Sequence, residues 1–221
     1  MGQVFELHKL SKESIVAVVT IDDIESSGYL CDALLNGGIT TIELTLRTKN
    51  AFDVMSYISK NYSDIIVGAG TVLSISQLEK SIQSGAVFAV APGFDIDIVE
   101  KSKQLNFPFA PGVCTPSDIQ MAIKYGCNVL KFFPAEPLGG MEYLNSIAAP
   151  FLQNKLRFIP LGGININIAA KYLESELILA IGGSWIAEQY LIKNGKWIEI
   201  QHRANEIRNL ITKIRGTSFE T

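Results

Sequence analysis

The sequence predicts a single (β/α)8 barrel domain, and three observations lead to this prediction. Eight short runs of β-forming residues alternate with helix-length segments along the whole chain. Repeats of strand and then helix build parallel sheets through right-handed crossovers. The chain has 221 residues, and no linker or shift in composition divides it. Eight such units usually take roughly 250 residues, so we expect residues 1–221 to form one barrel, with residues 1–12 as a short helix that caps one end.

The eight expected strands recur at intervals of roughly 20 to 30 residues, each bounded by turn or helix signals. They lie at residues 15–19, 41–46, 65–70, 87–90, 107–110, 128–133, 156–160 and 177–181. An open doubly wound sheet is the alternative, and it typically carries a glycine-rich turn after its first strand. Residues 20–23 contain no glycine, which favours the closed barrel.

Start and stop signals place the helices between these strands. Residues 27–36 and 74–84 are each followed by glycine, a frequent helix terminator. Thr115-Pro116-Ser117-Asp118 combines a capping residue, a proline at the first helical position and an acid three residues after the cap. Residues 203–215 mix charged and apolar side chains at helical spacing, so we expect them to form the closing helix.

Composition excludes several classes of protein. Hydrophobic residues make up 48% of the chain and the formal net charge is -3, which disfavours a disordered chain and a general nucleic-acid binder. The longest apolar runs are far shorter than the roughly 20 residues that cross a membrane. The cysteines, Cys31, Cys114 and Cys127, are odd in number and form no CxxC pair, so we expect reduced thiols in a cytoplasmic protein. The only two histidines are His8 and His202, and they disfavour a histidine triad or a multi-histidine metal site.

The second expected strand carries a polar face. Side chains alternate along a strand, so Glu43, Thr45 and Arg47 share one side while Ile42 and Leu44 share the other. The apolar side must face the helices, which directs the polar side into the barrel. A carboxylate there is costly unless it is paired or used in chemistry. A purely structural Glu43–Arg47 ion pair is the alternative interpretation.

The sixth expected strand carries Lys131 within an otherwise apolar run. Removing the water that stabilises a charged amine favours the neutral form, which is a nucleophile toward carbonyl groups. An interior glutamate could move the protons that Schiff-base formation and carbon–carbon cleavage require. A lysine that extends past the strand end into solvent is the alternative.

Glycine pairs follow the last two expected strands, Gly162-Gly163 and Gly182-Gly183. In barrels of this class the turns after strands seven and eight often bind phosphate through backbone N–H groups. Such a site needs no positive side chains, so it is compatible with an acidic protein. The pairs therefore predict a phosphorylated ligand.

These motifs together resemble the 2-keto-3-deoxy-6-phosphogluconate (KDPG) aldolase family, which includes 2-keto-4-hydroxyglutarate (KHG) aldolases. The most specific stretches are Glu-Leu-Thr-Leu-Arg-Thr at 43–48 and Lys-Phe-Phe-Pro-Ala-Glu at 131–136. The other matching stretches lie, in family order, at residues 68–72, 111–116, 162–164 and 182–185. The resemblance covers the chain from the first expected strand to the last.

The resemblance implies a class I aldolase that works without a metal or another cofactor. It implies that Lys131 forms a Schiff base with the 2-oxo carbon and that Glu43 is the general acid and base. Arg47 and Thr71 would then hold the substrate carboxylate. The remaining roles would fall to Pro92 and Phe133, which would shape the pocket, and to Gly162, Gly163, Gly183 and Ser184, which would bind the phosphate. The products would be pyruvate and glyceraldehyde 3-phosphate, and the family is usually a homotrimer.

One position departs from the family pattern. Leu161 stands where the family usually has threonine before its Gly-Gly-Ile sequence. The change removes a hydroxyl and adds bulk, and a lost hydrogen bond to substrate costs on the order of 1 kcal/mol. The pyruvate half of the site is complete, so the difference concerns the aldehyde half. The alternative substrates are 4-hydroxy-2-oxoglutarate and 2-keto-3-deoxy-6-phosphogalactonate.

Two other classes of function remain open at this point. A phosphosugar isomerase or epimerase could use Glu43 as base and Lys131 as an electrostatic partner, without cleaving a carbon–carbon bond. A non-catalytic protein could bind sugar phosphates at the glycine turns. A binding protein has no physical need for an interior lysine and carboxylate, so the aldolase is the favoured function.

Overall fold

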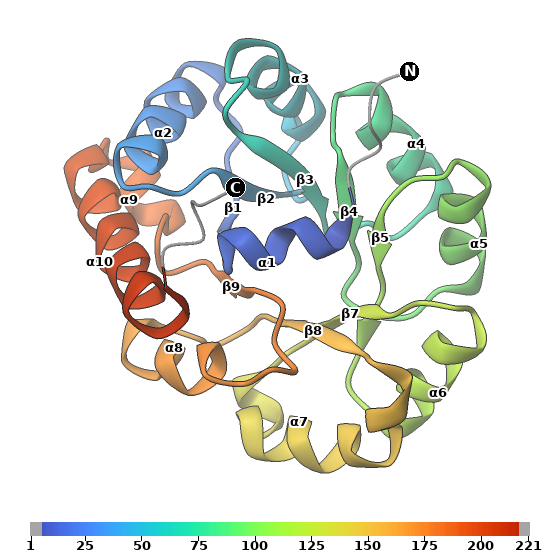
Figure 1. The fold of residues 1–221 in the computed structure, drawn as a ribbon. Helices are drawn as coiled ribbons and strands as arrows, with labels where there is room; N and C mark the ends of the chain where they lie inside the picture. The colour runs from blue at the N-terminus through green and yellow to red at the C-terminus, as the bar shows by residue number, and fades with distance from the viewer. Residues whose placement is uncertain (1–5, 217–221) are drawn as a thin grey trace.

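The structure is a computed structural model that describes residues 6–216. A ring of parallel strands lies at its centre and helices surround the ring, which is the predicted (β/α)8 barrel (Figure 1). The strands are β1 (Ile15–Val19), β2 (Thr41–Thr45), β3 (Ile66–Gly70), β4 (Phe88–Val90), β5 (Phe109–Ala110), β6 (Gly112–Val113), β7 (Val129–Phe132), β8 (Arg157–Pro160) and β9 (Ile181–Gly183).

Two ladders make up the ring, in the orders β5-β4-β3-β2-β1-β9 and β6-β7-β8. At one junction, β5 and β6 are two halves of the fifth barrel strand. The break falls at Pro111, which has no N–H to donate to a ladder. At the other junction, Phe158 of β8 forms a parallel bridge with Ile178, shortly before β9. The barrel therefore closes with eight strand positions, as the sequence predicts.

Two expected strands have different bounds in the structure. The fifth does not stop at residue 110, because pairing resumes at Gly112, opposite Lys131 of β7. The eighth, expected at residues 177–181, also continues further: residues 177–179 bond to Phe158 of β8, and β9 (Ile181–Gly183) then pairs with β1. Leu179 and Ala180, between these two stretches of pairing, are buried in the barrel interior.

Alternation along the strands separates two apolar layers. Val16, Phe88 and Val129 belong to the cluster that fills the inside of the barrel. Ile42 and Leu44 of β2 belong instead to the larger cluster between strands and helices. The intervening residues of β2 consequently face the barrel interior, which is the orientation expected for Glu43 and Thr45.

The helices pack around the ring. A side chain caps the start of α2, α4, α5, α6 and α8. The predicted capping box of α6 is confirmed: Thr115 and Asp118 each accept a hydrogen bond from the other's backbone N–H. The closing helix α10 begins at Trp197, earlier than residue 203. The helices are α2 (Ile24–Asn36), α3 (Ala51–Asn61), α4 (Ile75–Gln83), α5 (Ile96–Gln104), α6 (Pro116–Lys124), α7 (Gly140–Ala148), α8 (Ile166–Leu173), α9 (Gln189–Lys193) and α10 (Trp197–Arg215), with 3-10 turns at Glu136–Leu138 and Ala149–Asn154.

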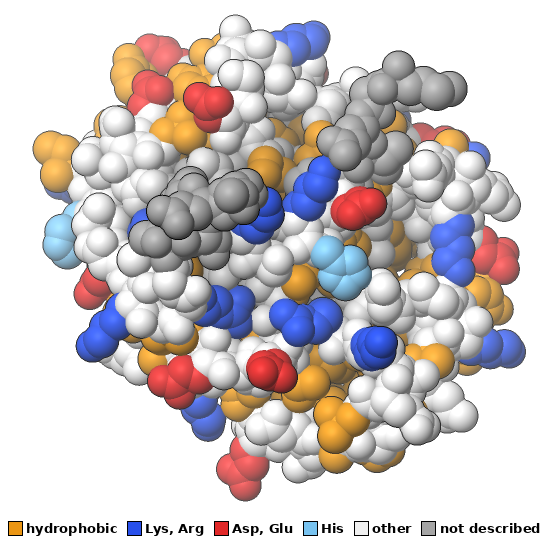
Figure 2. Space-filling model, in the orientation of Figure 1, with side chains coloured by type: hydrophobic (Ala, Val, Ile, Leu, Met, Phe, Trp, Pro, Cys, Tyr) orange, Lys and Arg blue, Asp and Glu red, His pale blue; other side chains and the backbone are white. Residues whose placement is uncertain are grey.

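A short helical segment precedes the first strand. It comprises a 3-10 turn at Leu7–Lys9 and α1 (Leu10–Glu13), and it lies across the end of the barrel at which the strands begin (Figure 1). Leu10 is fully buried and joins the interior cluster. Lysine and arginine side chains gather around the middle of this face (Figure 2). Of the segment 1–12 that was expected to cap the barrel, residues 1–5 lie outside the described part of the chain.

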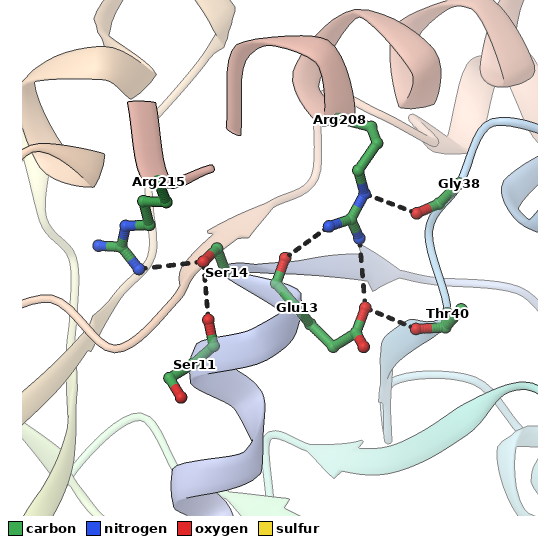
Figure 3. A network of polar contacts seen from close by, with 7 residues as sticks. All are labelled: Ser11, Glu13, Ser14, Gly38, Thr40, Arg208 and Arg215. Carbon is green, nitrogen blue, oxygen red and sulfur yellow. Dashed lines mark hydrogen bonds and ion pairs between the residues drawn. The ribbon is translucent and has the colours of Figure 1, made fainter. Parts of the chain in front are cut away.

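Polar contacts tie the last helix to this same end (Figure 3). Arg208 of α10 donates hydrogen bonds to the carbonyl of Gly38 at 2.7 Å and to the carbonyl and carboxylate of Glu13 at 3.1 and 3.2 Å. Arg215 donates to the Ser14 hydroxyl at 3.1 Å and to three backbone carbonyls nearby. The two arginines thus join α10 to the segments that precede β1 and β2.

Candidate active site

A cavity of about 190 Å³ opens at the carboxyl ends of the strands, opposite α1. Eight of its lining residues follow the end of a strand by one or two positions: Thr20, Arg47, Thr71, Pro92, Phe133, Leu161, Gly162 and Ser184. The complete lining is Val18, Thr20, Glu43, Thr45, Arg47, Thr71, Pro92, Lys131, Phe133, Leu161, Gly162, Gly182 and Ser184. The active site of a barrel of this kind lies at this end.

Lys131 and Glu43 meet at the bottom of the cavity. The Nζ of Lys131 lies 2.9 Å from Oε1 of Glu43, and the two side chains are only 5% and 3% exposed. Gly70 of β3 is what leaves room for the carboxylate, because a Cβ at that position would overlap it. Lys131 therefore does not extend into solvent, and Glu43 pairs with Lys131 rather than with Arg47.

This pair has the chemistry that the sequence predicts. A lysine amine is a potential nucleophile toward a carbonyl carbon. A carboxylate within hydrogen-bonding distance can accept a proton from that amine or return one to a bound intermediate. The cavity gives a small ligand access to both groups, so the arrangement can carry out Schiff-base chemistry.

Arg47 and Thr71 flank the pair on neighbouring strands. Arg47 is exposed at the end of β2 and forms no ion pair with any residue between 6 and 216, so its guanidinium is free for an anionic ligand. Thr71 follows β3 with φ 61°, a left-handed conformation that costs energy for a threonine. Strain of this kind often occurs at ligand-binding positions. Both residues line the cavity, as predicted.

Pro92 and Phe133 form apolar walls of the cavity. The ring centroid of Phe133 lies 5.5 Å from Nζ of Lys131, close enough for the ring to interact with a cationic nitrogen. The side chain of Leu161 is 4% exposed and packs onto Gly182, where a Cβ would overlap it. Leu161 thus presents hydrocarbon where a threonine would present a hydroxyl.

The glycine positions differ from one another in the structure. Gly162 and Gly163 form a true turn with φ 100° and 84°, and within the described part of the chain their N–H groups donate to no protein acceptor. Gly182 and Gly183 lie inside β9 and pair with Val16 and Ala17 of β1. Ser184 is exposed at the cavity rim. Of the predicted phosphate ligands, Gly162 and Ser184 line the cavity, whereas Gly163 and Gly183 are not among its lining residues.

Four lining residues were not among the predicted site residues: Val18, Thr20, Thr45 and Gly182. The hydroxyls of Thr20 and Thr45 lie 2.8 Å apart and form a polar edge on the β1–β2 side. Thr45 shares a strand face with Glu43, so alternation alone could have identified it. Thr20 lies just beyond β1, two positions after Val18, where sequence gives no comparable signal.

The described residues offer neither a metal site nor a membrane-spanning helix. No three histidine, cysteine, aspartate or glutamate residues between positions 6 and 216 are placed to hold a metal ion. In the same range no helix is both long and apolar enough to cross a membrane. Cys31, Cys114 and Cys127 are free thiols. Burial and a hydrogen bond with Asp118 raise the pKa of the Cys114 thiol, so it is a poor nucleophile.

Comparison with known proteins gave consistent matches. The family model for KDPG and KHG aldolase matches residues 7–203. A 2-dehydro-3-deoxy-phosphogluconate aldolase from Haemophilus influenzae is 36% identical over 205 residues, 93% of this chain and 96% of its own. The KHG/KDPG aldolase of Escherichia coli K12 is 36% identical over 197 residues, 89% and 92% of the two chains.

A solved structure of the same family also matches the fold. The crystal structure of KDPG aldolase from Legionella pneumophila superposes with a TM-score of 0.86 at 32% identity, and the match covers 91% of this chain and 97% of that one. That structure holds pyruvate captured at low pH as a covalent carbinolamine intermediate.

Proposed function

Because the chain belongs to the KDPG and KHG aldolase family, we propose that it is a class I aldolase, a lyase that cleaves 2-keto-3-deoxy-6-phosphogluconate to pyruvate and glyceraldehyde 3-phosphate. The relatives from Haemophilus influenzae and Legionella pneumophila support this activity. One observation carries the assignment to this chain's own residues. The buried amine of Lys131 lies 2.9 Å from the carboxylate of Glu43 inside a cavity at the active end of the barrel.

The first half of the reaction attaches the substrate. The amine of Lys131 attacks the C2 carbonyl, and Glu43 moves protons from nitrogen to oxygen to give a carbinolamine. Protonation of the carbinolamine hydroxyl by Glu43 expels water and leaves an iminium ion. Glu43 is in place for both proton transfers, because its carboxylate lies 2.9 Å from the amine. A positioned acid or base typically raises the rate by about 10²- to 10⁴-fold.

The second half breaks the carbon–carbon bond. Glu43 removes the proton of the C4 hydroxyl, the C3–C4 bond breaks, and its electron pair moves toward the iminium nitrogen. Glyceraldehyde 3-phosphate leaves and an enamine remains on Lys131. Protonation at C3 and addition of water then release pyruvate and restore the amine.

The other predicted residues bind the two ends of the substrate. Arg47 and Thr71 hold the C1 carboxylate, and a guanidinium that forms no ion pair with any described residue is suited to this role. Pro92 and Phe133 enclose the reacting carbons. The phosphate is bound at the far end by the backbone N–H groups of the Gly162–Gly163 turn and by Ser184, which directly follows the paired Gly183, as a helix-proximal turn binds anions.

Leu161 determines selectivity in the aldehyde half. It places hydrocarbon against the substrate region between the reacting carbons and the phosphate, so a substrate hydroxyl there finds no partner on this wall. The alternative substrates are 4-hydroxy-2-oxoglutarate, in line with the bifunctional name of the Escherichia coli relative, and 2-keto-3-deoxy-6-phosphogalactonate.

A comparison of Leu161→Thr with the wild type tests this role. We expect the variant to change the ratio of kcat/KM values among the three substrates by about tenfold, the effect of one hydrogen bond. Val18→Ala, on another wall of the cavity, is the matched control and should leave the ratio unchanged. Identical ratios in the wild type and Leu161→Thr would show that residue 161 does not discriminate.

The proposal extends to the domain organisation, oligomeric state and cellular location of the enzyme. We infer that residues 1–221 act as one domain, that three chains form a homotrimer, and that the enzyme works in the cytoplasm, where its free cysteines stay reduced. Its partners are the small 2-oxo acid phosphate and pyruvate, with no nucleic acid or membrane involved. Sedimentation equilibrium that gave the mass of a single chain would contradict the trimer.

Pyruvate release tests the activity itself. The purified chain with KDPG, coupled to lactate dehydrogenase, should oxidise NADH in proportion to the substrate added. If the chain exchanged substrate protons with deuterated water but released no pyruvate, an isomerase or epimerase would be the correct assignment. Binding without either reaction would indicate a non-catalytic protein.

A further inference from the structure

The loop that follows Lys131 is bonded to the glycine turn that follows β8. The N–H of Ala135 donates to the carbonyl of Leu161 at 2.7 Å, and the N–H of Glu136 donates to the carbonyl of Gly162 at 2.9 Å. In a trans peptide the N–H points opposite to the C=O. The N–H groups of Gly162 and Gly163 therefore both point away from this loop, as a pair of donors on one side of the turn.

The stem of Glu136 supports the turn from behind. A Cβ at position 163 would lie 2.7 Å from Cβ and 3.2 Å from Cγ of Glu136. Gly163 thus packs directly on this side chain. Any movement of Glu136 would be transmitted to the turn.

The carboxylate of Glu136 is fixed in turn by two helices. The hydroxyl of Tyr172, from α8, donates a hydrogen bond to its Oε1. Tyr172 is fully buried, and burial together with Glu136 raises its pKa, so the hydroxyl remains a donor. Gly140, at the start of α7, leaves the space, because a Cβ there would lie 2.6 Å from Oε1. Glu136 thus links the loop after β7, the glycine turn, α7 and α8.

We propose that Glu136 is a positioning residue for the phosphate site: with Tyr172 it holds the Gly162–Gly163 turn so that two N–H groups face the substrate phosphate. The inference rests on the proposed function, in which this turn binds phosphate. Glu136 itself does not touch the substrate. Its effect therefore concerns phosphorylated ligands and leaves the chemistry at Lys131 unchanged.

Kinetics of Glu136→Ala and Tyr172→Phe test this role, with Glu136→Gln as the matched control that keeps an acceptor for Tyr172. We expect Glu136→Ala to raise KM for KDPG by about tenfold or more, because small misplacements of binding groups are costly. Tyr172→Phe should raise it in the same direction by less, and Glu136→Gln should remain near the wild type. All three should exchange the methyl protons of pyruvate with deuterated water at wild-type kcat and KM, because that half-reaction involves no phosphate.

Two results would overturn the inference. An equal loss of KDPG cleavage and pyruvate exchange would assign Glu136 a general structural role, and an unchanged KM for KDPG in both Glu136→Ala and Tyr172→Phe would assign it none. A separate comparison concerns the proposed function. If the wild type had the same KM for KDPG and unphosphorylated 2-keto-3-deoxygluconate, the turn would not be a phosphate site, and the positioning role would fail with it.

Discussion

Lys131 and Glu43 are two buried ionisable groups that are hydrogen-bonded to each other. Removing one member of such a pair leaves the other buried and uncompensated, which typically costs 3–5 kcal/mol of stability. The pair is therefore expensive to retain for packing alone. Its position in an open cavity, rather than in the apolar core, indicates that chemistry is the reason for it.

Glu43→Gln tests the role of the carboxylate. The amide cannot accept or deliver a proton, so we expect kcat for pyruvate release to fall by about 10²- to 10⁴-fold, with KM close to the wild-type value. Glu25→Gln, at an exposed position on α2, is the matched control and should behave as the wild type. Steady-state kinetics on protein shown to be folded by circular dichroism provide the measurement, and a kcat within about twofold of the wild type would exclude proton transfer by Glu43.

At the scale of a single element, α6 shows how local sequence sets a helix start close to the site. Asp118 accepts hydrogen bonds from the N–H groups of Cys114 at 3.0 Å and Thr115 at 2.9 Å. Partial burial by itself would raise the pKa of Asp118, but these hydrogen bonds outweigh it and lower the pKa. The ionised carboxylate thus stabilises the folded chain.

Asp118→Ala should lower the free energy of unfolding at pH 7 by about 1 kcal/mol, the usual value of a helix cap. Because the folded-state pKa is lowered, the contribution is present above the unfolded-state pKa near 4 and is lost as pH falls below it. The difference between variant and wild type in urea unfolding should consequently narrow at acidic pH. Asp64→Ala, at an exposed aspartate, should leave the free energy of unfolding close to the wild-type value. A difference in unfolding free energy between Asp118→Ala and the wild type that stayed constant with pH would contradict the role of the ionised carboxylate.

The elements differ in how far sequence could predict them. Strand β2 and the start of α6 were predictable because their signals are local: alternation of side chains and a capping box. The eighth expected strand ended too early because Gly182 and Gly183 carry no strand signal of their own, and their pairing with β1 depends on a distant segment. Motifs could identify Lys131, Glu43 and Arg47, but not the contact of Glu136 with Gly163, since only folding brings those loops together.

At the scale of the whole molecule, the closing helix α10 is hydrogen-bonded to the end of the barrel opposite the cavity. Arg208 makes its contacts with Gly38 and Glu13 while being only 14% exposed. Stability and catalysis are therefore separated in space: one end of the barrel holds α10 against Glu13 and Gly38, and the other end holds the reactive groups.

Arg208→Ala should destabilise the protein by about 1–3 kcal/mol, because buried acceptors lose their donor. For a chain of this size that corresponds to a fall in Tm of several degrees. The kcat for KDPG cleavage at 25 °C should be unchanged. Lys213→Ala, exposed on the same helix, is the control for thermal melting, and an Arg208→Ala variant with wild-type Tm but reduced kcat would contradict the separation.

The most direct test of the central claim is to trap the covalent intermediate. The chain is incubated with pyruvate, reduced with borohydride, digested and mapped by mass spectrometry. We expect one peptide, the one that contains Lys131, to gain the mass of pyruvic acid less one oxygen atom, and Lys131→Met to gain none. An unmodified wild type, or an adduct on a different lysine that persists in Lys131→Met, would contradict a Schiff base on Lys131.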